Sequence, residues 1–261
     1  MRPIIALLTD FGTRDHYTGT MKGVMLGICP DATLVDITHD VPPHDVMAGA
    51  LELAASAKYF PAGTIFVVVV DPGVGSTRRG IAADTGDMRF VAPDNGVLTA
   101  VLRETPAKKI VELTERRYAR PTVSRTFEGR DRFAPAGAWL AKGIQLTALG
   151  RPVSGIQMLD LPLPEVSADS IQGVVLRVDR FGNLVTNIDR KAVERLGPVT
   201  IEAGGRSITR LVATYAELPA DDVGGLFGST DHLEIAAPSA SAAERLQLAR
   251  GSSVVIRRKS T

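Results

Sequence analysis

Apolar residues along the first part of the chain follow two patterns that alternate. Unbroken apolar runs, rich in β-branched residues, occupy positions 4–8 and 66–70. Such runs are typical of strands that are buried on both faces, as in parallel sheets. Between these runs, positions 17–28 carry apolar side chains at helical spacing, and positions 46–59 are rich in alanine and leucine. Strands that alternate with helices predict an α/β domain with a mainly parallel sheet and helices on both faces.

The same pattern continues to about residue 142. Further strands are expected at 33–37, 80–84, 88–92 and 109–113, and further helices at about 97–103 and 133–142.

The pattern changes near residue 160. A proline-rich segment, Leu161-Pro162-Leu163-Pro164, predicts a stiff, extended linker. Beyond it, helical spacing fades and short apolar runs are separated by Gly, Asn and Asp, which favours a small all-β domain, a barrel or a sandwich. These runs lie at 171–178, 184–188, 199–203, 207–212, 233–236 and 254–257. We therefore predict an N-terminal α/β domain over residues 1–160, a linker over 161–168 and a smaller barrel-like β domain over 169–261.

Composition and charge limit the classes of partner. Thirty basic and 29 acidic residues leave a net charge of +1, which gives no support for nucleic acid or an anionic membrane as partner. No apolar run approaches the roughly 20 residues that a membrane span requires. The single cysteine, Cys29, excludes an intramolecular disulfide and fits a cytoplasmic protein; its apolar neighbours indicate a buried, inert thiol.

Charged residues follow the predicted strands where ligands are usually bound. Asp10 follows the first strand, and Asp71 follows the 66–70 strand on a glycine-containing loop that continues to Arg78 and Arg79. In open α/β sheets, ligands bind beyond the carboxyl ends of the strands. Glu128 opens a predicted helix. Together, Asp10, Asp15, Asp71, Arg78 and Glu128 indicate a polar pocket in which carboxylates accept the paired hydroxyls of a ribose. A structural ion pair between Asp71 and one arginine explains the central loop equally well.

Residue spacing bears on two other kinds of site, a phosphate-binding loop and a metal site. The segment DPGVGSTRRG fits neither glycine-rich phosphate-binding pattern. His39, Asp40, His44 and Asp45 cluster within seven positions and are candidate metal ligands. However, Asp45 is expected to cap the following helix. A metal-dependent hydrolase therefore stays as an alternative function.

Several long motifs resemble one family. They are TDFGTRDHYTGTMKGVMLGICPDATLVDITHDVPPHDVMAGA, YFPAGTIFVVVVDPGVGSTRRGIA, APDNGVL, FEGRD and VDRFGNLVTNI. In this order they closely resemble the S-adenosyl-L-methionine (SAM) hydroxide adenosyltransferases, the family that also contains the fluorinase and the chlorinase. The resemblance implies an N-terminal α/β domain joined to a barrel-like domain, and a homotrimer with active sites between the N-domain of one subunit and the C-domain of the next. It also implies a small-molecule reaction without metal or organic cofactor, in which water or hydroxide attacks the ribose C5′ of SAM to give adenosine and L-methionine.

The resemblance also assigns roles in the N-terminal domain. The Asp-Arg-His set of the hydrolase branch corresponds to Asp71, Arg78 and position 128. Asp10 would bind the ribose diol, and Tyr17 would lie near the methionine end. The halogenating branches carry an aromatic residue where this chain has Asp71, and an acid there would repel halide, so hydrolysis is favoured.

Four residues of the C-terminal domain correspond to ligand contacts. Asp179 would meet the methionine ammonium, Phe181 would pack on adenine, and Asn183 would hydrogen-bond its edge. Ser229 would approach the methionine carboxylate.

The chain departs from the family pattern at two positions. The hydrolases read F-H-G-R-D where this chain has Glu128 in place of the histidine. A glutamate can accept a proton, but a second carboxylate beside Asp71 adds negative charge, which hinders hydroxide and favours a cationic sulfonium. We expect slower hydrolysis or an altered pH optimum, and the alternative is a catalytically weak protein that binds SAM or adenosine. Pro238 replaces a usual asparagine and removes a backbone donor, which puts ligand contacts there in question.

Overall fold

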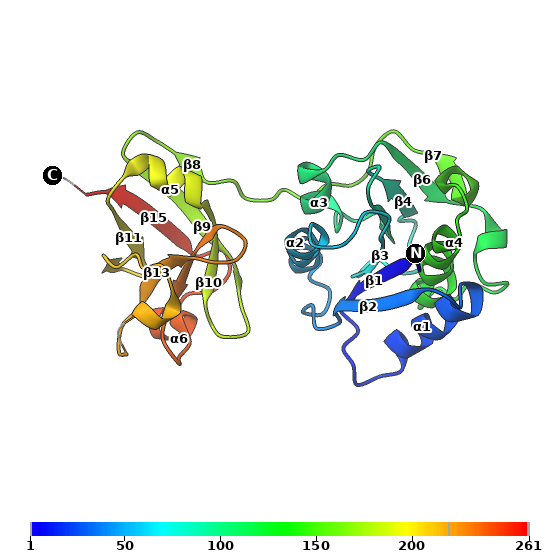
Figure 1. The fold of residues 1–261 in the computed structure, drawn as a ribbon, viewed down its shortest axis with the longest axis horizontal. Helices are drawn as coiled ribbons and strands as arrows, with labels where there is room; N and C mark the ends of the chain where they lie inside the picture. Colours follow the sequence, from blue (N-terminus) through cyan, green and yellow to red (C-terminus); the bar gives the residue numbers. More distant parts are fainter. Residues whose placement is uncertain (1, 219, 260–261) are drawn as a thin grey trace. The chain divides into compact units, whose positions relative to one another are not determined.

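A computed structural model describes residues 2–218 and 220–259. The chain divides into two compact units, Met1–Leu161 and Pro162–Thr261, and each is described by itself (Figure 1). The first unit is α/β and the second is an almost all-β barrel-like unit, as the sequence predicts.

The N-terminal unit is built on a seven-stranded sheet of order β2-β1-β3-β5-β4-β6-β7. The pairs β1–β2, β1–β3 and β3–β5 are parallel, whereas β4 is antiparallel to both β5 and β6, and β7 is antiparallel to β6. β6 therefore points the same way as β5, and only β4 and β7 run in the opposite direction. The expected mainly parallel sheet is confirmed. The strands are β1 (Ile4–Thr9), β2 (Thr33–Thr38), β3 (Ile65–Val69), β4 (Gly80–Asp84), β5 (Arg89–Pro93), β6 (Lys109–Leu113) and β7 (Gly150–Pro152).

Helices cover both faces of this sheet (Figure 1). On β1, Ile5 and Leu7 pack in one core with α1 (Tyr17–Ile28) and α4 (Ala134–Ala141). Ala6 and Leu8 pack in the opposite core with α2 (Val46–Ala57) and α3 (Thr99–Glu104). Alternate residues of a strand point to opposite faces, so a strand buried on both sides must be apolar throughout. This explains the unbroken apolar runs.

Short helical segments complete the N-terminal unit. The Asp45 carboxylate caps α2 by accepting from the Ala48 N–H at 3.0 Å, as expected. The remaining segments are η1 (Arg116–Tyr118), a π-helical turn η2 (Gly129–Phe133) directly before α4, and η3 (Leu146–Leu149).

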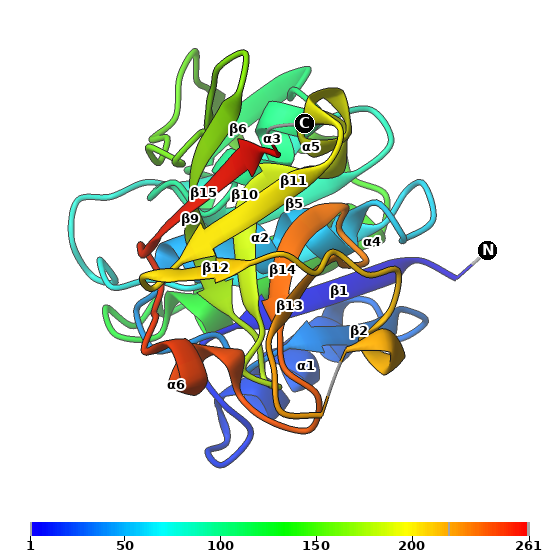
Figure 2. The ribbon, with the colours of Figure 1, turned by 90° about the vertical axis from the view of Figure 1, so that its left-hand side faces the viewer.

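The C-terminal unit forms one antiparallel, nearly closed sheet of order β12-β11-β15-β9-β10-β14-β13, with β8 paired to β9 (Figure 2). A bridge between Leu211, just after β12, and Gly225 in β13 connects the two ends of this order. The strands are β8 (Glu165–Val166), β9 (Ser170–Val178), β10 (Leu184–Asp189), β11 (Val199–Ala203), β12 (Arg206–Ile208), β13 (Gly224–Phe227), β14 (His232–Ala236) and β15 (Ser253–Arg258).

The C-terminal elements differ from the sequence pattern in several places. The run at 207–212 contains only the short β12, because the chain leaves β11 after Ile208 to reach β13. β13 was missed because its two leading glycines hide the strand pattern. Two short helices, α5 (Arg190–Leu196) and α6 (Ala242–Leu246), were also missed, since neither is long enough to show helical spacing clearly.

Two features of the described residues bear on the sequence analysis. None of the helices within residues 2–218 and 220–259 is long and apolar enough to cross a bilayer. Cys29 is buried, as its apolar neighbours indicated.

The packing of α4 on β3 generates a stability prediction. A methyl group added at Gly137 would overlap the Val67 side chain, so Gly137→Ala is expected to destabilise the unit by about 1–3 kcal/mol, although alanine favours helix. Denaturant unfolding followed by the fluorescence of Trp139, which lies in the same helix, measures this. Gly23→Ala in α1 is the matched control, because nothing lies within 4 Å of its added methyl. Equal stability of both variants would contradict the proposed close packing.

Candidate active site

Strand register brings the predicted N-terminal site residues to one edge of the sheet. In the parallel β1–β3 pair, Thr9 lies beside Val69, so the residues that follow, Asp10 and Asp71, leave the sheet at the same end. β4 runs the opposite way and begins at Gly80. The chain therefore enters β4 from this same edge, and Arg78 lies there.

Arg78 lies between two carboxylates. Its Nε donates to Asp71 Oδ1 at 2.9 Å and its Nη2 donates to Asp71 Oδ2, which makes a bidentate pair. The same Nη2 donates to Glu128 Oε2 at 2.5 Å. The structure thus brings Asp71, Arg78 and Glu128 together from positions as far as 57 residues apart in the sequence.

The neighbouring arginine, Arg79, binds a different carboxylate, that of Asp94. Arg79 donates from Nε to Asp94 Oδ2 at 2.8 Å, and Asp94 Oδ1 accepts from the Gln157 N–H at 2.7 Å. Through Asp94, Arg79 connects the start of β4 to the backbone at Gln157, so the Arg79–Asp94 pair has a structural role. Of the two arginines that the sequence left open, Arg78 is the one that contacts Asp71.

The three charged groups are largely removed from solvent. The side chains of Asp71, Arg78 and Glu128 are 4%, 10% and 11% exposed. Burial alone lowers the pKa of the Arg78 guanidinium, but the hydrogen bonds and charges of Asp71 and Glu128 together outweigh it, so its pKa lies above the ordinary value. Arg78 therefore stays cationic, and the trio carries one net negative charge when both acids are ionised.

Local backbone structure directs Glu128 toward Arg78. Glu128 immediately precedes the π-helical turn η2, a kind of irregular turn that is frequent at functional sites. A methyl group at Gly129 would press on the Met21 sulfur at 3.2 Å, so the next residue must be small. One turn later, Arg132 Nη1 lies 3.8 Å from Glu128 Oε1, a loose second ion pair.

The last acid of the FEGRD motif has a structural role. The Asp131 side chain is fully buried, and it accepts from Arg130 Nε at 2.7 Å and from the Ser124 N–H at 2.8 Å. Burial acts to raise its pKa, but the contacts with Arg130 and Ser124 outweigh this effect and lower it. Asp131 thereby fixes the preceding loop.

A cavity of about 300 Å³ adjoins these carboxylates and contains Asp10, Asp71 and Glu128 in its lining. Phe11, Tyr17 and Phe127 lie together beside it, with ring centroids 5.0–5.9 Å apart. The cavity wall thus combines carboxylates with aromatic rings, which suits a flat organic ring joined to a hydroxylated or cationic group.

Asp10 is held by the backbone of the next loop. Its Oδ2 accepts from the His44 N–H at 2.9 Å, and His44 has a positive φ of 67°, which is unusual for a residue other than glycine. The sequence analysis considered His44 only as a metal ligand, and it missed Phe11 and Phe127 as cavity walls. Phe11 precedes Gly12 in the TDFG motif and Phe127 precedes Glu128 in the FEGRD motif, and these positions could have indicated that both rings lie at the site.

Two of the four candidate metal ligands, His39 and Asp45, are engaged in other contacts. His39 is buried, and its Nδ1 lies 2.8 Å from the Thr9 hydroxyl oxygen, while Asp45 caps α2. Within residues 2–218 and 220–259, no three His, Cys, Asp or Glu side chains are grouped so as to hold a metal ion.

The predicted C-terminal residues lie on two loops of the second unit. Asp179 Oδ1 accepts from the N–H groups of Phe181 and Asn183, and Asp179 Oδ2 accepts from the Asn183 side-chain amide at 2.9 Å. On this turn, Phe181 is 77% exposed. Ser229 is exposed on the turn between β13 and β14.

Pro238 occupies a turn in which its geometry is favourable. Ala237 and Ala240 form a bridge around it, and Ser239 has a φ of 52°. Proline restricts φ and suits the first corner of such a turn.

A hydrogen-bonded pair in the C-terminal unit, between an exposed tyrosine and a buried glutamate, was not predicted from the sequence. The Tyr215 hydroxyl donates to Glu234 Oε2 at 2.6 Å, although the two residues are 19 positions apart. Partial burial, followed by the hydrogen bond to Glu234 and the charges of Glu234 and Asp179, raises the pKa of Tyr215 well above its ordinary value. Asp179 and this pair are therefore close enough to interact electrostatically.

Comparison with known proteins gives matches over both units of the chain. Residues 5–150 match the SAM hydroxide adenosyltransferase N-terminal domain, and residues 173–255 match the C-terminal domain of that family. The chain is 36% identical over 259 residues to an (R)-S-adenosyl-L-methionine hydrolase of Thermus thermophilus, covering 96% of this chain and 98% of that protein. It is 33% identical over 222 residues to a fluorinase of Actinoplanes sp., covering 75% and 74%. A solved structure, described as an uncharacterized conserved protein from Thermotoga maritima, matches with a TM-score of 0.91 at 34% identity and covers 97% of this chain and all of that one.

The Tyr215–Glu234 pair generates a pH prediction. Because the folded chain holds the phenolic proton more tightly than the unfolded chain does, this group stabilises the fold below about pH 10, and the stabilisation is lost as the pH rises. The phenolate absorbance of the folded protein can be followed in an ultraviolet titration. The absorbance difference between wild type and Tyr215→Phe should show no phenolate forming near pH 10. A phenolate that forms at the ordinary pH would contradict the pairing.

Proposed function

The chain belongs to the SAM hydroxide adenosyltransferase family, and we propose that Asp71, Arg78 and Glu128 are the catalytic residues with which it hydrolyses SAM to adenosine and L-methionine. It is an enzyme, and the hydrolase relatives from bacteria and archaea support SAM as its substrate. The observation that carries the assignment of roles is the buried bidentate contact between Asp71 and Arg78 at the wall of a cavity.

The chemistry requires help for the nucleophile and none for the leaving group. The sulfonium of SAM leaves as neutral methionine, so no acid is needed. Water must instead be held in line with the C5′–S bond and lose a proton as it attacks. Asp71, fixed by Arg78 in a site with little solvent, is positioned to orient such a water and to accept its proton.

Glu128 changes the charge of the site. Arg78 Nη2 donates to both carboxylates, so one guanidinium faces two acids and balances only one of their two negative charges. The remaining negative charge attracts the cationic sulfonium and opposes hydroxide. Glu128 thus favours substrate binding over fast turnover, a reason to expect hydrolysis with a modest rate.

Other residues are proposed to bind the substrate. Asp10 has one carboxylate oxygen occupied by the His44 N–H, which leaves the other oriented by that contact for a ribose hydroxyl. Tyr17 is proposed to lie along the methionine end.

The C-terminal residues are proposed to act in a homotrimer with sites at subunit interfaces. Phe181, exposed on a turn ordered by Asp179 and Asn183, is suited to pack on an adenine brought by such an assembly. Ser229 is proposed to contact the methionine carboxylate.

We propose that the reaction needs no metal or organic cofactor, because the leaving group is already activated. We also propose a cytoplasmic location, which suits an intracellular substrate and a chain whose one cysteine is buried.

A catalytically weak SAM-binding protein is the second candidate. It is favoured by one observation, the engagement of Arg78 by two carboxylates at once. Turnover separates the two functions.

The catalytic role of Asp71 can be tested with the purified protein and SAM. We expect adenosine and methionine in equal amounts, unchanged by a chelator, and a loss of about 100-fold or more in kcat for Asp71→Asn. Asp40→Asn is the matched control, since this exposed acid follows β2 at the same edge and should leave the rate unchanged. Tight binding of SAM without product would support the second candidate instead.

The cost of Glu128 can be measured by restoring an imidazole. Glu128→His removes a negative charge and supplies a proton acceptor, so kcat should rise about tenfold or more. Glu128→Gln is the control, because it removes the charge without the imidazole. If neither Glu128→His nor Asp71→Asn changed the rate, the assigned trio would be wrong.

A further inference from the structure

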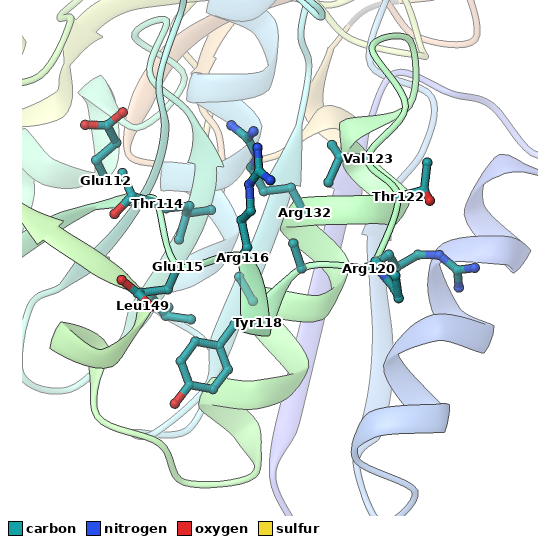
Figure 3. A pocket seen from close by; sticks show the side chains of 14 residues that line it. Glu112, Thr114, Glu115, Arg116, Tyr118, Arg120, Thr122, Val123, Arg132 and Leu149 are labelled. Carbon is teal, nitrogen blue, oxygen red and sulfur yellow. The ribbon is translucent and has the colours of Figure 1, made fainter.

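A second cavity of the N-terminal unit lies at the same sheet edge, beyond the end of β6. It measures about 500 Å³, and its lining includes residues of the 114–123 loop and Arg132 of η2 (Figure 3). Three arginines line it: Arg116, Arg120 and Arg132. We call it the arginine pocket.

Two of these arginines have little or no anionic partner within the chain. Among residues 2–218 and 220–259, the Arg116 guanidinium has no hydrogen bond or ion pair. Arg132 lies 3.8 Å from Glu128, which Arg78 already contacts at 2.5 Å. In Figure 3, Arg116 and Arg132 occupy the centre of the view, whereas the Arg120 guanidinium points away from them.

The acids around the pocket are matched by other cations. Glu112 pairs with Arg151 at 3.3 Å, and Glu115 lies 3.8 Å from Arg117. Asp131 is held by Arg130 and, at 3.3 Å, by Arg120. The lining therefore retains a surplus of positive charge, concentrated at Arg116 and Arg132.

The frame of the pocket is ordered before any ligand arrives. The buried Asp131 accepts the Ser124 N–H, and its backbone carbonyl accepts the Arg120 N–H at 2.8 Å, so the C-terminal part of the loop is tied to η2. The stem of Arg132 packs beside Gly80, where an added methyl would lie 3.2 Å from its Cδ. An ordered site loses less entropy on binding.

The remaining walls suit an organic ligand. Apolar side chains, among them Leu113, Val123 and Leu149, line part of the pocket, and Thr114 and Thr122 add hydroxyl groups. The volume lies in the range of small-molecule sites. Guanidinium groups bind phosphate and carboxylate groups with paired hydrogen bonds.

We propose that the arginine pocket binds a small organic oxyanion with at least two negative charges, bearing phosphate or carboxylate groups, through Arg116 and Arg132. Its charge preference is opposite to that of the active-site cavity, where two carboxylates face a sulfonium cation. Arg132 separates the two, so the bound anion lies one side chain away from Glu128.

Isothermal titration calorimetry at fixed ionic strength tests this with the full chain, using pyrophosphate and citrate as probes of the two chemistries. We expect one saturable site per chain with a Kd of about 1 mM or lower for at least one probe. Arg116→Ala should weaken binding at least tenfold, and Arg132→Gln should do the same. Arg206→Ala, which removes an exposed arginine of β12, should bind as wild type does.

The relative affinities of the two probes identify the class of ligand. Tighter binding of pyrophosphate indicates a phosphate ligand, and tighter binding of citrate indicates a polycarboxylate. Because Arg116 is exposed and lies outside the active site, its alanine variant should fold and hydrolyse SAM normally. Absence of saturable binding by both probes, or unchanged binding by a folded Arg116→Ala protein, would overturn the proposal.

Discussion

The sharing of the Arg78 guanidinium between Asp71 and Glu128 is the interaction on which the candidate active site depends. Two carboxylates with less than one eighth of their surface exposed would be costly to ionise side by side without a cation between them. Arg78 makes that arrangement possible and fixes the direction of both acids. Removal of this guanidinium would leave two buried negative charges without their closest partner.

The sheet supplies the geometry that this interaction needs. Parallel strands β1 and β3 deliver Asp10 and Asp71 to one edge, and the reversed strand β4 returns Arg78 to it. The π-helical turn before α4 then adds Glu128 from the covering layer. The same edge continues to β6, where the arginine pocket begins, so cavities of opposite charge character lie along one sheet edge with Arg132 between them.

The sequence predicts the part of the site that depends on strand ends. Asp10 and Asp71 could be placed because a buried strand precedes each of them, and the family resemblance selected Arg78 and position 128. Local pattern alone could not distinguish Arg78 from Arg79, since adjacent residues differ only in which acid their side chains reach. Phe11 and Phe127 were missed as walls because their contact is formed by tertiary packing. Tyr215 and Glu234 were missed for the same reason, and the C-terminal helices were too short to show a period.

The central claim is that water, oriented by the Asp71–Arg78 pair, attacks the ribose C5′ of SAM. The most direct test is mass spectrometry of the products formed by the protein in ¹⁸O-labelled water. The account predicts one ¹⁸O atom in adenosine, at its 5′ oxygen, and none in methionine. Unlabelled adenosine, or label in methionine alone, would contradict it.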